Sequence, residues 1–183
     1  MALRLSPGEL ENKITNEKLR PVQIISIALA TGVVIFFIIC YVLYSMHTVN
    51  ALPENISPET LNVLLYALIA ICAGMYSAAF KLPDIIIGKS VEALKNSNDT
   101  NETLVDKLLG LHRTYTIIRY AMLEGTALIG LVILIISIIS GEIYVNSLYW
   151  LTALPALIFV SIIAVSFPTK EKVINFINNK CMN

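Results

Sequence analysis

Four long apolar runs constrain the fold of this chain more than any other feature of its sequence. They extend over residues 22–45, 61–80, 117–140 and 145–167. Each run has about 20 residues or more, and a helix of that length spans a hydrocarbon core of roughly 30 Å. The runs therefore predict an all-α, polytopic membrane protein with a four-helix transmembrane bundle.

The composition agrees with this prediction. Of the 183 residues, 56% are hydrophobic, and the mean hydropathy of +0.74 is too high for an ordinary soluble domain. A polar, partly acidic segment precedes the first run, and the A-x-A pattern of a signal-peptide cleavage site is missing after Tyr44. We therefore expect the first run to remain as a membrane anchor.

The basic residues are distributed unevenly, although the formal net charge is zero. All 13 Lys and Arg lie before residue 22, between residues 81 and 119, or after residue 167. The segments 46–60 and 141–146 carry only acidic charges. The positive-inside rule therefore predicts that both termini and the long central segment are cytoplasmic. The compact layout favours a multi-pass protein of a bacterial inner (plasma) membrane.

This topology divides the chain into five segments. They are a cytoplasmic amphipathic N-terminal segment (1–21), a first transmembrane hairpin (22–83), a cytoplasmic loop with short amphipathic helices (84–115), a second transmembrane hairpin (116–168) and a cytoplasmic tail (169–183). We expect the amphipathic segments to be interfacial anchors. Docking sites for a soluble partner are the alternative.

The two hairpins show signs of an internal repeat. Residues 23–32 align with residues 116–125 through the pattern I-I-x-x-A-[LM]-x-x-G, at an offset of 93. Because the first and third spans run in the same direction, the repeat would be parallel, with its pseudo-two-fold axis along the membrane normal. The pattern therefore predicts two duplicated helical hairpins in parallel repeat.

Small residues recur at a four-residue spacing on three of the spans. Such residues allow close backbone approach, and dispersion then holds the helices together in lipid. We predict that they pack helices inside the bundle, with an oligomer interface as the alternative. They are Ala28, Gly32, Ala70, Gly74, Ala121 and Gly125.

The fourth span contains a proline and an aromatic group. Pro155 removes one backbone hydrogen bond and predicts a kink, with Thr152 placed to satisfy a freed carbonyl. Tyr144, Tyr149 and Trp150, near the outer end, are typical of membrane-interface anchors.

Glu124 is the one carboxylate that lies unambiguously at membrane depth. Ionisable groups are expensive there, so such a residue is a candidate functional site by default. Tyr120, one helical turn earlier, shares its face, and Thr31 occupies the equivalent position of the repeat and could donate a hydrogen bond. Arg119 could extend to the inner interface. Glu124 is then either a structural carboxyl that joins the repeats or a proton or ion site.

The sequence AMLEGTALIGLV, residues 121–132, resembles the carboxylate helix of the rotary ATPase proteolipid family. In that family a membrane-embedded Glu is followed shortly by Gly-Leu-Val, and some members have duplicated hairpins. The resemblance implies proton or cation chemistry at Glu124. The family carries its carboxylate on the second helix of a hairpin, however, whereas Glu124 is on the first. The overall layout is also similar to that of small four-helix bacterial membrane proteins.

The segments outside the spans favour a non-enzymatic function. They lack a nucleophile–base pair, a metal cluster and a phosphate-cradling loop, so we expect no catalytic residue, cofactor or metal site. Cys40, Cys72 and Cys181 show no C-x-x-C spacing, and His47 and His112 fall on opposite predicted sides of the membrane.

We therefore predict an accessory or structural subunit of a membrane complex. Its expected partners are the lipid bilayer and either further copies of the chain or other membrane subunits, and not nucleic acid. The alternative is a proton- or cation-coupled small carrier, or a proteolipid-like subunit, that uses Glu124.

Overall fold

The computed structural model describes residues 13–46, 58–95 and 101–182. All regular secondary structure in these ranges is helical. Four helices are long and apolar enough to cross a membrane. The predicted all-α fold with four membrane-spanning helices is therefore confirmed.

Three of the four spans are continuous helices, and the fourth is broken. The elements are α2 (Asn16–Met46), α3 (Pro58–Lys95), α4 (Asn101–Ile139), α5 (Glu142–Val145), the 3-10 helix η1 (Ser147–Ala153), α6 (Leu154–Ser166), α7 (Lys170–Ile177) and the π-helical turn η2 (Asn178–Met182). Together η1 and α6 make up the fourth span.

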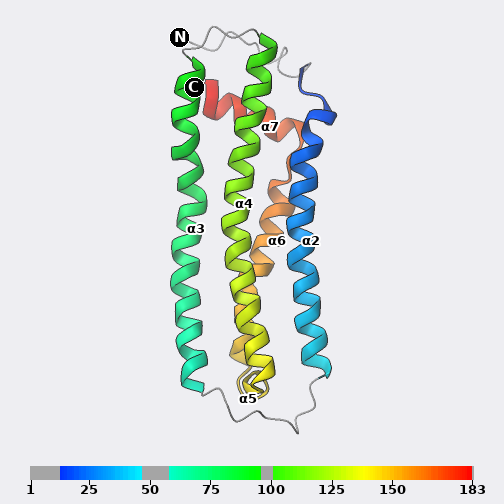
Figure 1. Ribbon diagram of the computed structural model, residues 1–183, viewed down its shortest axis with the longest axis vertical. Coiled ribbons are helices and arrows are strands. Elements are labelled where there is room, and N and C mark those ends of the chain that lie inside the picture. The colour runs from blue at the N-terminus through cyan, green and yellow to red at the C-terminus, as the bar shows by residue number, and fades with distance from the viewer. Residues whose placement is uncertain (1–12, 47–57, 96–100, 183) are drawn as a thin grey trace.

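α4 is the central helix of the bundle (Figure 1). It packs against α2, α3 and α6, whereas α2 and α3 lie on either side of it and, between their described residues, scarcely contact each other. α6 lies behind α4 in this view and also packs against α2. As a result, α4 is the most buried of the four spans and α3 the least.

The core of the spans is apolar, as it must be where no water is available to polar groups. The Cys40 thiol donates a hydrogen bond of 3.8 Å to the carbonyl of Leu131, which fixes α2 against α4. Fully buried side chains of this core come from all four spans and include Val33, Leu61, Ala79, Leu123, Ala127, Leu134 and Phe159.

The end of the bundle where α2 ends and α3 begins is closed by aromatic side chains that pack on one another. The rings of Tyr44 and Tyr144 are stacked with centroids 4.9 Å apart, and Trp150 lies edge-on to Tyr44 at 5.1 Å. The Tyr149 ring is 1% exposed, and its hydroxyl bonds to Asn62 Oδ1 at 3.1 Å. Tyr149 is therefore a core residue and not the interface anchor that its position in the sequence predicted.

The segment predicted as a loop with short helices, 84–115, is helical throughout its described residues. α3 continues through Pro83 to Lys95, and α4 begins at Asn101, so both spans extend well beyond the apolar runs (Figure 1). Pro83 forfeits one hydrogen bond to the preceding turn. The extensions persist because residues spaced by four, such as Ile87 with Val91 and Leu104 with Leu108, are buried together.

A second apolar cluster, here named the tail cluster, joins five segments at the end of the bundle where α3 ends and α4 begins. The C-terminal helix α7 crosses the ends of the long helices (Figure 1) and contributes Val173 and Ile177. Its N-cap is Thr169, whose side chain accepts from the Lys172 N–H. The buried members of the cluster are Ile14, Leu19, Ile87, Val91, Leu104, Val105, Leu108, Val173 and Ile177.

The amphipathic segments therefore pack on one another, where interfacial anchoring was predicted. Each apolar face is covered by the apolar face of another segment. These faces are therefore removed from water by protein and do not require contact with lipid. Two exposed ion pairs border the cluster: Lys18–Asp106 at 2.7 Å and Lys180–Asp84 at 2.9 Å. The hydrogen bond to Asp84 raises the pKa of Lys180. The first part of the predicted N-terminal amphipathic segment, residues 1–12, lies outside the described residues.

The internal repeat stays a prediction. α4 and α6 pack closely, whereas the described parts of α2 and α3 do so only slightly. α3 is one unbroken helix, and the fourth span changes from 3-10 to α-helical geometry.

Candidate functional site

Glu124 lies half-buried on α4. Within the described residues its carboxyl has neither a hydrogen-bond donor nor a basic partner. Leu131, two turns further along, shares its face, and the Leu131 carbonyl is the atom contacted by Cys40 of α2. Glu124 therefore occupies the side of the central helix that faces α2.

Tyr120 is not a hydrogen-bond partner of Glu124. Its ring is 2% exposed, and its hydroxyl bonds to the backbone oxygen and the hydroxyl of Ser166 on α6, at 3.1 and 2.9 Å. Helical side chains lean toward the N-terminus of their helix. The Tyr120 hydroxyl is therefore carried away from Glu124, toward the end of α6.

Thr31 is not brought to Glu124 either. It is exposed on α2, while its neighbours Ala30 and Val33 face the apolar core. Thr31 is rotated by about 100° around the helix from Ala30. Its hydroxyl therefore points outward. The predicted constellation of Glu124, Tyr120 and Thr31 is therefore not assembled within this chain.

Arg119 is half-buried and packs on an aromatic ring. Its guanidinium carbon lies 4.6 Å from the centroid of Phe80 on α3, a cation–π distance. The Nε atom is buried and has no hydrogen-bond partner among the described residues. The same side chain borders a groove of about 390 Å³ that runs along α6 past Ser161 and Ser166.

Five of the six small residues predicted to pack helices inside the bundle are not used in that way. Ala28, Gly32, Ala70, Gly74 and Ala121 are all exposed. A Cβ added at Gly32 or Gly74 would meet no atom within 4 Å. The prediction was wrong because α2 and α3 flank α4 without approaching each other.

The sixth small residue, Gly125, is only in loose contact with its surroundings. A Cβ added there would approach only the end of Met75, at 4.0 Å. The inward faces of the flanking helices carry larger side chains, among them Val33 of α2 and Leu68 of α3.

The close helix approach occurs instead at Gly130, which the sequence analysis did not single out. A Cβ there would overlap the carbonyl oxygen of Thr152 and lie 3.5 Å from Pro155 Cγ. The narrow 3-10 helix η1 brings its backbone against α4 at this point. Gly130 stands one turn after Thr126, so the two residues do have the four-residue spacing of small residues. The pair lies outside the shared repeat pattern and was not among the predicted packing residues.

Pro155 lies where the fourth span changes its geometry. η1 ends at Ala153, α6 begins at Leu154, and Pro155 is in the first turn of α6, where no N–H is required. The Thr152 hydroxyl donates to the Tyr149 carbonyl at 2.7 Å. This is not the role expected for it, because the carbonyl that Pro155 would free is that of Leu151, which accepts from the Leu154 N–H. The kink predicted at Pro155 stays a prediction, and the structure shows a change of helix type at this point.

The cysteines and histidines form no joint site in the described chain. Cys40 is buried, Cys72 is half-buried, and both are free thiols. His47 lies outside the described residues. His112 is 8% exposed and packs edge-on against Phe176, with centroids 4.9 Å apart. Among residues 13–46, 58–95 and 101–182 no cluster of three or more potential metal ligands occurs.

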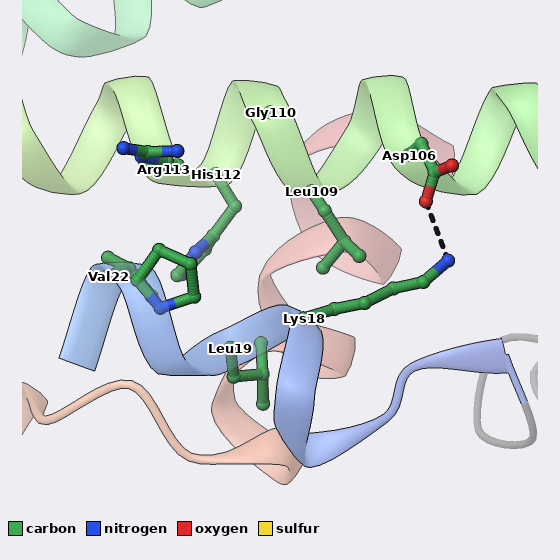
Figure 2. Close-up of a pocket in the computed structure, with 9 residues that line it drawn as sticks. Lys18, Leu19, Val22, Asp106, Leu109, Gly110, His112 and Arg113 are labelled. Atoms are coloured by element: carbon green, nitrogen blue, oxygen red, sulfur yellow. Dashed lines mark hydrogen bonds and ion pairs between the residues drawn. The ribbon is translucent and has the colours of Figure 1, made fainter. Parts of the chain in front are cut away.

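A cavity of about 260 Å³ opens between α2 and α4, next to the tail cluster (Figure 2). Lys18 and Asp106 form an ion pair at one end, and Arg113 and His112 lie toward the other. No site was predicted here, because most of these residues come from the predicted N-terminal segment (1–21) and the predicted loop (84–115). Only the packing of α2 on α4 brings them together.

Fold and geometry together define an all-α protein with four helices able to cross a membrane. The central helix carries a carboxyl that has no partner among the described residues. No protein-family model, curated protein or solved structure matches this chain. Its function is therefore argued from its own residues.

Proposed function

We propose that this chain is a non-enzymatic subunit of a membrane complex, and that α2 and α3 pack against transmembrane helices of another subunit. One observation carries the proposal: the small residues Ala28, Gly32, Ala70 and Gly74 are exposed on the outside of the bundle. In lipid, smooth faces of this kind favour close helix association through dispersion. The setting is a bacterial inner membrane, with both termini in the cytoplasm.

The position of Glu124 supports the same proposal. A charged carboxyl at the bilayer centre costs roughly 2.5–3.5 kcal/mol on insertion scales. Its own chain supplies no partner within the described residues. A polar or basic side chain on a neighbouring subunit that reached the accessible part of this half-buried carboxyl would offset this cost.

The test compares small-to-large substitutions on different helices. Gly32→Ile and Gly74→Ile should release the chain from its native complex, because neither position contacts the rest of the bundle. Ala164→Ile is the matched control, since Ala164 is also small and exposed but lies on α6. The readout is the size of the complex in native gels of mild-detergent extracts, followed by mass spectrometry of the bands.

If both glycine variants keep the complex intact, the proposed interface is wrong. Complexes that contain this chain alone would mean that the same faces join identical copies, which is the oligomer alternative.

A small proton- or cation-coupled carrier is the second candidate, favoured by the unpaired, half-buried Glu124. It predicts that Glu124→Gln abolishes proton or cation flux in proteoliposomes while the protein still folds. It also predicts carbodiimide labelling of Glu124 that falls as pH rises. Glu142→Gln, at the outer end, is the control. Flux that survives Glu124→Gln would remove this candidate.

A further inference from the structure

The cavity between α2 and α4 has an uncompensated positive charge (Figure 2). At one end of the cavity, Lys18 and Asp106 form an ion pair of 2.7 Å, so their charges neutralise each other. Arg113 is exposed, and in the described chain no carboxylate lies within ion-pair distance of it. A net charge of one cation therefore remains in the cavity.

His112 adds a hydrogen-bonding group that the fold itself does not use. The residue is 8% exposed, and its imidazole lines the cavity. Its ring packs edge-on against Phe176, but no hydrogen bond of its nitrogens joins it to another described residue. A neutral imidazole always presents one N–H donor. The His112 nitrogens are not among the fully buried, unpartnered polar atoms of the described residues, so this donor remains accessible to a ligand in the cavity.

The level of the cavity along the membrane normal indicates the chemistry of that ligand. The apolar runs begin at Val22 on α2 and at Ile117 on α4. Lys18 and Arg113 each lie one turn before these residues, about 6 Å along the helix axes. In the proposed orientation this is the level of the lipid phosphates of the inner leaflet. Basic pockets between spans at this level are typical sites for anionic headgroups.

Gly110 leaves the cavity open. It lies on α4 one turn before Arg113, and a Cβ added there would meet no atom within 4 Å. A phosphate group can therefore approach the helix surface between Arg113 and the Lys18–Asp106 pair.

We propose that this cavity binds a phosphate group, with Arg113 donating two N–H groups to its oxygens and His112 donating a third. A guanidinium matches two phosphate oxygens at once, which a lysine cannot do. The phosphate is carried either by the headgroup of an anionic lipid or by a free phosphate ion. The proposal depends neither on Glu124 nor on the small-residue faces of α2 and α3.

The experiment uses the full-length protein in nanodiscs that contain phosphatidylcholine and a trace of photoactivatable phosphatidylglycerol. Arg113→Gln should reduce cross-linking about tenfold or more, the expected effect of losing a charge-assisted hydrogen-bonding group. His112→Phe keeps an aromatic ring against Phe176 and should cause a smaller loss. Gly110→Leu fills the cavity without changing any charge and should abolish the cross-link to α2 and α4.

Arg20→Gln is the matched control, because Arg20 is an exposed cation at nearly the same depth that does not line the cavity. Retention of the lipid by both Arg113→Gln and Gly110→Leu would overturn the proposal. An equal loss in Arg20→Gln would also overturn it, because lipid would then respond only to surface charge. Circular dichroism of each variant checks that the helices are intact.

A second arm distinguishes the two carriers of the phosphate group. Inorganic phosphate is added at millimolar concentration, with chloride at equal ionic strength as the comparison. Undiminished cross-linking supports the lipid headgroup. Displacement by phosphate and not by chloride supports a free phosphate ion in the same cavity. Equal displacement by both salts would overturn the site, because simple screening would explain the binding.

Discussion

At the scale of single residues, the side chains that fix this bundle differ from those that the sequence pattern emphasised. The pattern predicted close approach at Ala28, Gly32, Ala70 and Gly74, but the backbones meet at Gly130. Spacing reveals that a face is smooth. It does not reveal which helix lies opposite, because apolar side chains of every span are compatible with lipid.

Gly130→Ala should destabilise the protein by about 1–3 kcal/mol, the usual cost of overpacking. The reason is that the new Cβ overlaps a backbone oxygen, that of Thr152, which cannot rotate away. Thermal unfolding in detergent measures the effect. Gly32→Ala is the control and should be close to neutral, since the space around it is open. Equal melting temperatures for the two variants would contradict the packing of η1 on α4.

Tyr120→Phe should cost about 0.5–1.5 kcal/mol, the range for one hydrogen bond. The variant keeps the buried ring and removes only the hydroxyl that bonds to Ser166. Tyr66→Phe removes a hydroxyl from a side chain that is 70% exposed and should leave stability unchanged. The same unfolding assay compares the two. No difference between them would argue against the contact of α4 with the end of α6.

Glu124 could be found from the sequence, but its surroundings could not. A lone carboxylate in an apolar run is visible without any structure. Which neighbours face it depends on helix rotation and on the partner helix. The structure turns the Tyr120 hydroxyl to Ser166 and leaves Thr31 outside.

At the scale of elements, amphipathic periodicity correctly predicted helices beyond the spans. It also predicted that lipid would cover their apolar faces, whereas other helices of the chain cover them. In the C-terminal segment, Val173 and Ile177 are spaced by four residues on one apolar face, and both are buried. The face packs on α3 and α4 residues in the tail cluster, where lipid contact was expected. A hydrophobic stripe has the same period whether lipid or protein covers it.

Val173→Asp should release α7 from the bundle, because it places a charge among fully buried apolar side chains. Limited trypsin digestion should then cleave at Lys170 and Lys172 at least several times faster. Asn175→Asp adds the same charge at an exposed position of the same helix and is the control. If both variants are cleaved at the wild-type rate, α7 does not depend on the tail cluster.

At the scale of the whole molecule, the number of spans could be read from the sequence because length and hydropathy suffice for it. The central position of α4 could not. All four spans are apolar around most of their circumference. Their hydrophobic patterns therefore do not show which helix the other three pack around. The positions of the long helical extensions also depend on packing, in particular on the burial of Ile87 and Leu104 in the tail cluster.

The distribution of basic residues predicts the orientation of the whole bundle. In a variant without native cysteines, Ser147→Cys should react in intact cells with a membrane-impermeant maleimide. Lys89→Cys, on the exposed extension of α3, should react only after the cells are opened. The reverse pattern would place the tail cluster outside and would also remove the inner-leaflet setting of the phosphate site.

The central position of α4 has a consequence for biogenesis. A membrane protein is synthesised from its N-terminus, so α2 and α3 enter the bilayer before α4 has been made. Since the described parts of these two helices scarcely contact each other, contacts between them contribute little to holding the early pair together. The bundle can close only when α4 inserts between them. Until then the nascent chain depends on lipid, or on the insertion machinery, to keep its first two spans in place.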